Sequence, residues 1–293
     1  MQTLHGFLFL MAYLAALLGN GLIIMLITVD PQLHTPMYFF LKNLSLIDLC
    51  YISDTVPKFA LNSLMNRNTI FFLGCVFQVL FLVTFASSEI AILTVMSYDR
   101  YVAVCRPLHY EIIMTKGACG RMVVASFISV GVYGAMHTAP TFPTTFRFNK
   151  IHHFFCDIPQ IILISETKMN INEAAVSAFS ASIALVCFLS ILYSHVHIFS
   201  AISRFSSLED RSKALSTCLT HVIVVTVFLT TAALAYLKPA SELRSDLDIT
   251  LSVFYTVVPP SVNPIIYSLR NKDIKLTVGK VLGTVSLSQI KYV

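Results

Sequence analysis

The chain has 293 residues, of which 56% are apolar and 12% are charged, and its formal net charge is +5. An ordinary soluble domain carries about 25% charged residues, so the composition disfavours the alternative of buried helices in a large soluble protein. The basic residues form no stripe interleaved with aromatic side chains. The positive charge therefore gives no support to nucleic-acid binding.

Seven apolar windows along the chain are long enough to cross a membrane, because about 30 Å of hydrocarbon takes roughly 20 helical residues. They are residues 7–29, 37–56, 75–96, 122–140, 174–199, 215–237 and 249–267. Several contain Ser, Thr, Asn or a charge, as helices packed in a bundle do. The pattern predicts an all-α membrane protein with a bundle of seven transmembrane helices and with its termini on opposite sides.

Basic residues predict the orientation of this bundle. If Arg100 faces the cytosol, thirteen of the twenty Lys and Arg residues lie in the segments on its side and seven lie opposite. This bias satisfies the positive-inside rule. We therefore expect an extracellular N-terminus and a cytoplasmic C-terminus.

Residues 96–110 read Met-Ser-Tyr-Asp-Arg-Tyr-Val-Ala-Val-Cys-Arg-Pro-Leu-His-Tyr, at the end of the third window. Arg100 is placed to hold its guanidinium against a neighbouring carboxylate such as Asp99 until a partner displaces it. Such a contact is worth several kcal/mol when partly desolvated and almost nothing when wet. The triplet alone is a weak signal, but the fifteen residues resemble the third-helix signature of olfactory receptors, a branch of the rhodopsin-like G-protein-coupled receptors.

Further motifs occur in the order of that family. They are Gly-Asn-Gly at 19–21, Pro-Met-Tyr-Phe-Phe-Leu at 36–41, Leu-Ser-Leu-Ile-Asp-Leu-Cys at 44–50, Lys-Ala-Leu-Ser-Thr-Cys-Leu-Thr-His at 213–221 and Pro-Ser-Val-Asn-Pro-Ile-Ile-Tyr-Ser-Leu-Arg-Asn at 260–271. After them, residues 272–282 are expected to form a short amphipathic helix. The resemblance covers nearly the whole chain.

The resemblance implies a plasma-membrane odorant receptor rather than an enzyme. It implies that a small, mostly apolar, volatile or semi-volatile ligand binds within the bundle, and that a stimulatory, olfactory-type G protein then raises cAMP. By alignment to the family, the inward-facing ligand residues are Leu82, Val83, Ala86, Ser87, Ser177, Ala178, Ala181, Ser182, Leu229, Ala232, Ala233, Tyr236, Val253 and Thr256. Leu82 stands where amine receptors place an aspartate, so no cationic ligand is expected. For each position alone, core packing is an equally good interpretation.

The G-protein switch implied by the resemblance consists of Asp99, Arg100, Tyr101, Asn263, Pro264 and Tyr267. Cys75, at the outer end of the third helix, and Cys156, in the loop after the fourth, are expected to form one disulfide in an oxidising compartment. The other five cysteines are interpreted as small apolar side chains. Two further loop cysteines usual in the family are replaced here by Phe146 and Ile164.

Two acids, Asp48 and Glu89, lie within the windows, and each would be costly if buried alone and charged. Glu89 precedes Arg100 by eleven residues, about 16 Å along a helix, which is near the depth of Asp48. Two interpretations stay open. In the first, the acids share a proton or hold a cation, and the resemblance to related receptors implies a sodium ion or a water cluster that stabilises the inactive bundle. In the second, they are hydrogen-bonded and only fix the packing. No other metal is implied, since no cysteine or histidine cluster has zinc spacing.

The first window is not interpreted as a signal peptide, because it is long and lacks a basic n-region and a cleavage site. Residues 1–293 are expected to form a single receptor domain whose N-terminal extracellular leader is truncated. A transporter or channel is the alternative from another class, but we find no internal repeats. A truncated receptor with poor surface expression and little signalling is a third.

Overall fold

The structure is a computed structural model that describes residues 2–65, 70–142, 155–158, 161, 171–204, 207–236, 246–270 and 274–279. In some helical turns, including 231–236 and 246–253, only the backbone is described.

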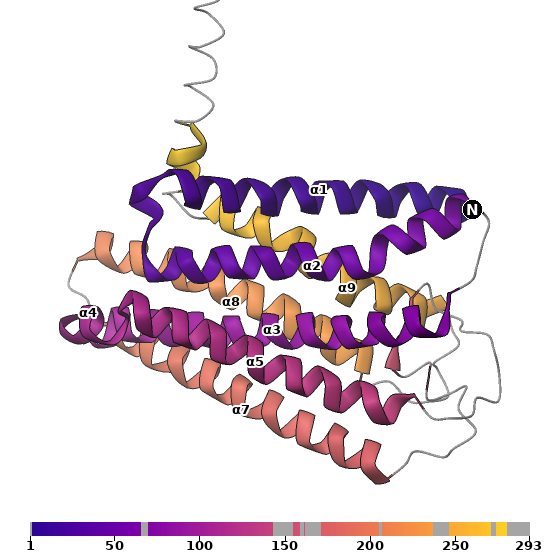
Figure 1. Ribbon diagram of the computed structural model, residues 1–293. Helices are drawn as coiled ribbons and strands as arrows, with labels where there is room; N and C mark the ends of the chain where they lie inside the picture. Colours follow the sequence, from indigo (N-terminus) through magenta and orange to yellow (C-terminus); the bar gives the residue numbers. More distant parts are fainter. Residues whose placement is uncertain are drawn as a thin grey trace, which may run out of the picture.

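Seven long helices lie roughly side by side in these segments and form one bundle (Figure 1). They are α1 (Gln2–Val29), α2 (Pro36–Leu64), α3 (Phe72–Cys105), α5 (Lys116–Thr141), α7 (Ile171–Ile202), α8 (Leu208–Tyr236) and α9 (Asp246–Arg270). Each of the seven predicted windows lies in one of them, apart from residue 237 at the end of the sixth window, which lies outside the described residues. The predicted helix bundle is confirmed.

The helices extend beyond the apolar windows because their polar ends continue the backbone hydrogen bonding past the hydrocarbon. α3 runs nine residues past its window, through the Asp99–Arg100 pair, to Cys105. α2 continues through Pro57 to Leu64 and bends in its second half (Figure 1). A proline within a helix removes one hydrogen bond and is a common cause of such a bend.

Four helices qualify as membrane spans by length and composition alone among the described residues. These are Gly6–Val29, Phe72–Cys105, Lys116–Thr141 and Ala175–Ile202. α7 carries many exposed apolar side chains, such as Val186 at 63% and Tyr193 at 58% exposure. An apolar surface of this kind is expected to face lipid.

Short elements connect the long helices at the end that contains Arg100, which we call the Arg100 end. η1 (Pro31–Leu33), η2 (Pro107–His109) and α4 (Tyr110–Ile113) lie there, and residues 274–279, within the predicted amphipathic segment, are helical. The Thr277 hydroxyl donates to the Asp30 carboxylate at 2.8 Å. This bond ties the segment after α9 to the end of α1.

The first and last long helices approach closely. A Cβ atom on Gly19 of α1 would lie 3.0 Å from the side chain of Pro264 on α9. Pro264 has no N–H to donate to the carbonyl of Pro260 four residues earlier, and the Asn20 amide donates to that carbonyl instead, at 2.9 Å. A side chain of α1 therefore satisfies the backbone carbonyl of α9 that Pro264 leaves without an N–H donor.

α3 is the central helix, since it packs against α2, α5, α7 and α8. The largest core cluster gathers buried side chains from α1, α2, α3, α5, α7, α8 and α9, including Leu44, Ile92, Val224 and Tyr267. The position of α3 places its two ends at the centre of the two ends of the bundle. Both candidate sites described next are built on it.

Candidate functional site

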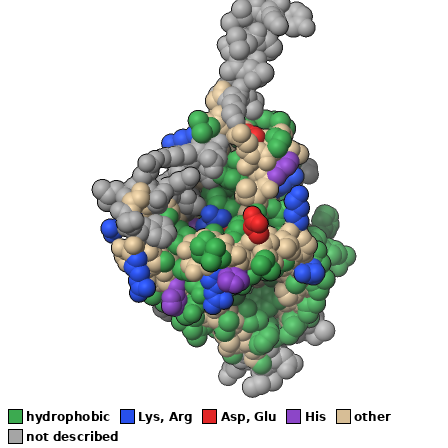
Figure 2. All heavy atoms as spheres, turned by 90° about the vertical axis from the view of Figure 1, so that its left-hand side faces the viewer, with side chains coloured by type: hydrophobic (Ala, Val, Ile, Leu, Met, Phe, Trp, Pro, Cys, Tyr) green, Lys and Arg blue, Asp and Glu red, His purple; other side chains and the backbone are tan. Residues whose placement is uncertain are grey.

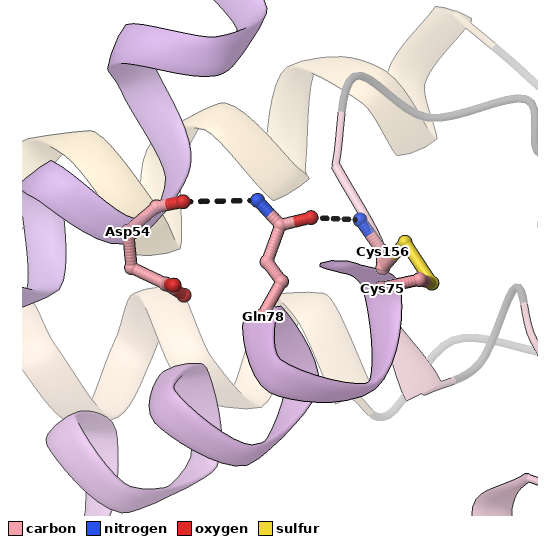
Figure 3. Close-up of a disulfide and its surroundings, with 4 residues drawn as sticks. All are labelled: Asp54, Cys75, Gln78 and Cys156. Atoms are coloured by element: carbon pink, nitrogen blue, oxygen red, sulfur yellow. Dashed lines mark hydrogen bonds between the residues drawn. A yellow bond between two sulfur atoms is a disulfide. The ribbon is translucent and has the colours of Figure 1, made fainter. Parts of the chain in front are cut away.

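The predicted disulfide joins Cys75, in the first turn of α3, to Cys156 in the segment before α7, with 5.5 Å between the Cα atoms. Next to it, the Gln78 side chain bridges two elements (Figure 3). Its amide nitrogen donates to the carbonyl of Asp54 on α2, and its oxygen accepts from the N–H of Cys156, both at 2.9 Å. One covalent bond and one buried side chain therefore fix this segment over the end of the bundle, which we call the disulfide end.

The segment closes one side of the interior at this end. Phe155 is buried in a cluster with Tyr51, Leu82 and Tyr255, and its ring meets that of Tyr255 edge to face at 6.0 Å. The Tyr255 hydroxyl donates to the buried Asp157 carboxylate at 2.7 Å. The segment around Cys156 thus contacts α3 and α9 through both apolar and polar side chains.

The two intramembrane acids meet at one amide. Asn263 on α9 donates to both carboxylate oxygens of Asp48, at 3.1 and 3.3 Å, and to Glu89 at 3.0 Å. All three side chains are buried, and the second oxygen of Glu89 has no hydrogen-bond partner within the described residues. The site therefore joins α2, α3 and α9 through two acids without a neighbouring cationic side chain in the contacts described.

At the Arg100 end, the Arg100 guanidinium lies against the carboxylate of Asp99, with Nε 2.9 Å from the oxygen that it shares with Nη2. The other Asp99 oxygen accepts from the Tyr110 hydroxyl at 2.8 Å. Asp99 is fully buried, whereas the Arg100 side chain is 18% exposed. The ion pair is therefore partly desolvated, and a partner protein can still reach the Arg100 side chain.

Tyr110 was missed by sequence reasoning, although it closes the fifteen-residue motif. It lies at the start of α4, eleven residues after Asp99. Burial and then the Asp99 carboxylate raise the pKa of its phenol, so it stays a hydrogen-bond donor. Its spacing from the acid gave no periodic signal, because η2 turns the chain back between them.

Comparison with known proteins decides the family. The family model described as "Olfactory receptor" matches residues 9–284. The human proteins olfactory receptor 14A16 and olfactory receptor 14J1 are 51% and 50% identical to this chain, over 96% and 99% of it and 91% of each relative. The chain belongs to the olfactory receptor family.

A solved structure shows the same fold at lower similarity. The crystal structure of squid rhodopsin superposes with a TM-score of 0.75 at 16% identity, over 94% of the receptor and 79% of that chain. This match shows a rhodopsin-like fold. Family membership makes the chain an odorant-sensing, G-protein-coupled receptor of the plasma membrane with several spans, and it confirms the expectation that the chain is not an enzyme. Its partners are an odorant and a G protein.

The structure brings part of the expected ligand set together. Leu82 and Ala86 on α3 lie in the cluster with Phe155 and Tyr255. Thr256, which follows Tyr255 in α9, is buried. Leu229 of α8 is half-buried and packs against the largest core cluster. Phe85 packs against that cluster and also against the Leu82 cluster, so it lies between the two. Val83 points instead to a neighbouring cluster with the two disulfide cysteines. Ser87 is half-buried.

The remaining ligand positions are not gathered around this cluster. The four on α7 are exposed: Ser177, Ala178, Ala181 and Ser182. Ala232, Ala233, Tyr236 and Val253 lie where only the backbone is described. Phe146 and Ile164, which replace the family's extra loop cysteines, lie outside the described residues. For all of these, ligand contact stays a prediction.

Two histidines form a contact in the core that sequence reasoning did not identify. His221 on α8 places Nδ1 3.2 Å from Nε2 of His195 on α7, and its Nε2 lies 3.0 Å from the carbonyl of Leu93 on α3. His195 Nδ1 lies 2.8 Å from the carbonyl of Ile191. Each of these three contacts needs one N–H donor, and two neutral imidazoles together carry only two N–H groups. All three contacts are hydrogen bonds only when the pair carries a third proton on its ring nitrogens. The pair joins α3, α7 and α8.

Proposed function

We propose that a small, mostly apolar, volatile or semi-volatile odorant binds between α3, α8 and α9 below the Cys156 segment. Binding shifts the bundle so that Arg100 leaves Asp99 and engages a stimulatory G protein, which raises cAMP. The observation that carries the proposal is the placement of both sites on α3: the Leu82 cluster at the disulfide end and the Asp99–Arg100 pair at the other.

The side chains around the Leu82 cluster favour an apolar ligand. Leu82, Ala86 and Leu229 offer only carbon, and the nearby hydroxyl groups belong to Ser87, Thr256 and the tyrosines. Asp157 is the one acid that the described contacts place beside the cluster. Its carboxylate accepts a hydrogen bond from the Tyr255 hydroxyl. Such a lining binds by dispersion and one or two hydrogen bonds.

The helix geometry supports communication between the two sites. Leu82 and Arg100 are eighteen residues apart, about 27 Å along α3. On α8, Leu229 and His221 are eight residues apart, about 12 Å. A displacement of α8 by the ligand therefore acts on the histidine contacts that hold α8 to α3 and α7.

The proposal includes a sodium ion held by Asp48 and Glu89 in the inactive state. The residues fit it, because two buried carboxylates share one amide and one Glu89 oxygen has no described partner. Carboxylate oxygens are ligands for hard cations, and the ion would neutralise the negative charge there. We expect that replacing sodium with N-methylglucamine raises odorant potency and that Glu89→Gln removes this effect. An unchanged potency in the unmutated receptor would instead favour hydrogen-bonded acids that only fix the packing.

We propose that the disulfide end is extracellular, with the N-terminus, and that the Arg100 end is cytosolic, with the C-terminus. The support is the basic character of the Arg100 end, where Figure 2 shows Lys and Arg side chains around the rim. Epitope tags at the two termini test this: only the N-terminal tag should stain on intact cells.

Ala86→Phe tests the binding site. The larger side chain should fill the space next to Leu82 and suppress responses to every agonist, while surface staining stays near normal. Ala125→Phe, on an exposed part of α5, is the matched control and should respond normally. Unchanged potency of Ala86→Phe across a ligand panel would place the binding site elsewhere.

Leu229→Tyr tests the direction of selectivity. The new hydroxyl should raise the potency of ligands with an acceptor oxygen roughly tenfold relative to ligands without one, because a hydrogen bond contributes about 1 to 1.5 kcal/mol. A uniform change for ligands with and without an acceptor would contradict a contact between Leu229 and the odorant.

A further inference from the structure

A groove beside the switch is not used by the proposed function. It lies between α3, α5 and α7, has a volume of about 700 Å³ and is lined mainly by apolar atoms. Tyr98 and Tyr101 of α3 line it, together with Val186, Leu189 and Tyr193 of α7. Its lining on α3 extends from Thr94 to Tyr101, seven steps along the helix that rise about 10 Å.

The groove opens toward the hydrocarbon of the membrane. Val186, Leu189 and Tyr193 are 63%, 51% and 58% exposed, and all three lie in the membrane span Ala175–Ile202. Figure 1 shows α5 and α7 together on the side of the bundle opposite α1. Water is therefore not the natural occupant of the groove, and a lipid chain has direct access to it.

Three phenol hydroxyls at the groove are available to a ligand. Those of Tyr98, Tyr101 and Tyr193 make no hydrogen bond within the part of the chain that the structure describes. In contrast, the hydroxyls of Thr94, Ser190 and Ser194 donate to carbonyls of their own helices. A polar group at the Arg100 end of the groove can thus accept from tyrosine, whereas the deeper part offers only apolar contacts.

Two arginines adjoin the groove, one through a contact with the Tyr101 ring and one in sequence. The Arg106 guanidinium is 5.9 Å from the centre of the Tyr101 ring, and Arg121 directly precedes Met122, another lining residue. Both arginines are exposed, and neither forms an ion pair among the described residues. Basic pockets between helices on the cytosolic side suit anionic lipid headgroups.

We propose that the groove binds an anionic phospholipid of the cytosolic leaflet. One acyl chain occupies the apolar part, the phosphate lies near Arg106 and Arg121, and the phenols donate to the ester or phosphate oxygens. A neutral phospholipid or a sterol would fill the apolar part but would leave both arginines without a counter-ion. The inference rests on the orientation proposed above, which the epitope tags test separately.

The lipid would adjoin the switch. Tyr98 and Tyr101 flank the Asp99–Arg100 pair in sequence, and the Tyr101 ring meets those of Tyr193 and His197 on α7, each at 6.1 Å. An occupied groove therefore adds contacts between α7 and the part of α3 that carries the pair.

Tryptophan quenching tests the proposal, because the chain contains no tryptophan. Phe188→Trp puts a single reporter beside the groove without replacing a lining residue. Leu22→Trp, on α1 across the bundle, is the matched control, since the two native side chains are 43% and 41% exposed. Each variant is placed in phosphatidylcholine vesicles with a minor fraction of phosphatidylserine, at a lipid excess that keeps receptors apart. The acyl chains of one lipid or the other carry bromine.

Brominated phosphatidylserine should quench the Phe188→Trp variant several times more than its share of the lipid predicts, and should quench the Leu22→Trp variant only in proportion to that share. Equal quenching of the two variants would show ordinary surrounding lipid and overturn the proposal. Preferential quenching of the Phe188→Trp variant by brominated phosphatidylcholine would show that the groove takes a neutral lipid, which also overturns it.

Charge variants test the role of the arginines. In the Phe188→Trp background, Arg106→Gln and Arg121→Gln should each lower the preference for phosphatidylserine roughly fivefold, because one basic residue near a membrane surface contributes about 1 kcal/mol. Lys275→Gln removes an exposed cation from the segment after α9 and should leave the preference unchanged. An equal loss in all three variants would reflect net charge alone and would contradict a defined site.

Discussion

α3 is held by different chemistry at the two ends of the bundle. At the disulfide end, α3 is joined to the Cys156 segment by a covalent bond and by Gln78, whose neutral amide also bonds to α2. On the side of Arg100, the contacts join ionisable side chains. Asp99 contacts Arg100 and Tyr110 at the end itself, and His195 contacts His221 deeper in the core.

This difference matches the proposed roles of the two ends. A disulfide and a buried amide do not change with a proton or a competing ion, so the odorant meets a fixed arrangement of α2, α3 and the Cys156 segment. An ion pair that is reachable from outside can exchange one partner for another with little loss of free energy. The receptor thus combines a fixed binding end with an exchangeable signalling end.

The largest expected effect breaks the fixed end. Cys75→Ser or Cys156→Ser should abolish surface expression, since a cross-link that spans 81 residues contributes about 4.5 kcal/mol. The double variant should be no worse than either single variant, because one substitution already removes the bond. Surface staining measures this, with Cys50→Ser, at a free cysteine, as the control. Clearly additive losses would mean that the two are not bonded to each other.

Arg100→Ala should break the exchangeable end and abolish agonist-driven cAMP, because it removes the cation that we propose engages the G protein. Asp99 is fully buried, so removal of its counter-ion also leaves an uncompensated charge. The double variant Asp99→Asn, Arg100→Ala removes that charge and should reach the surface while remaining silent. A normal cAMP response in either variant would refute the role of Arg100. Arg204→Ala, at an exposed arginine after α7, should signal normally.

Tyr110→Phe should weaken the same end without removing the ion pair. The variant loses the hydrogen bond from the Tyr110 hydroxyl to the charged Asp99 carboxylate, which contributes about 1.5 kcal/mol to the inactive state. Basal cAMP should therefore rise roughly tenfold. The pKa of Tyr110 is raised, so the phenol keeps its proton until the pH rises past that value. The difference from the unmutated receptor should therefore be constant between about pH 6 and pH 9. A difference that grows with acidity would point to another group.

The smallest expected effect concerns the histidine pair. His221→Phe removes the contacts of α8 with α3 and α7 and should raise basal cAMP by roughly fivefold, for about 1 kcal/mol of hydrogen bonding. His195→Phe should act in the same direction, and the double variant should exceed the larger single effect only slightly, because the two share one contact. Fully additive increases would show that the histidines act independently.

Much of the fold follows from the sequence because the membrane imposes a simple rule. A window of roughly 20 apolar residues predicts a helix, and all described residues of the seven windows lie in helices. The ends could not be predicted this way, since α3 continues to Cys105 through polar residues whose helical hydrogen bonds depend on tertiary packing.

The candidate site was less predictable from the sequence. The pairing of Cys75 with Cys156 followed from the side of the membrane on which each lies. The histidine pair depends on the rotation of α7 about its axis, and apolar residues occur on all sides of that helix. Tyr110 depends on a reversal of the chain in η2. Hydrophobic periodicity carries no information on either.

The hydrogen bond from Asn20 to the Pro260 carbonyl has a consequence for synthesis. Its partners are 240 residues apart, near the two ends of the chain. A ribosome adds about 5 to 20 residues per second, so roughly 10 to 50 s pass between the synthesis of Asn20 and the synthesis of Pro260. During that time α1 lies in the membrane with an amide whose final partner has not been made. The bond can therefore form only when the last helix arrives, which makes the contact between α1 and α9 a late step in assembly of the receptor.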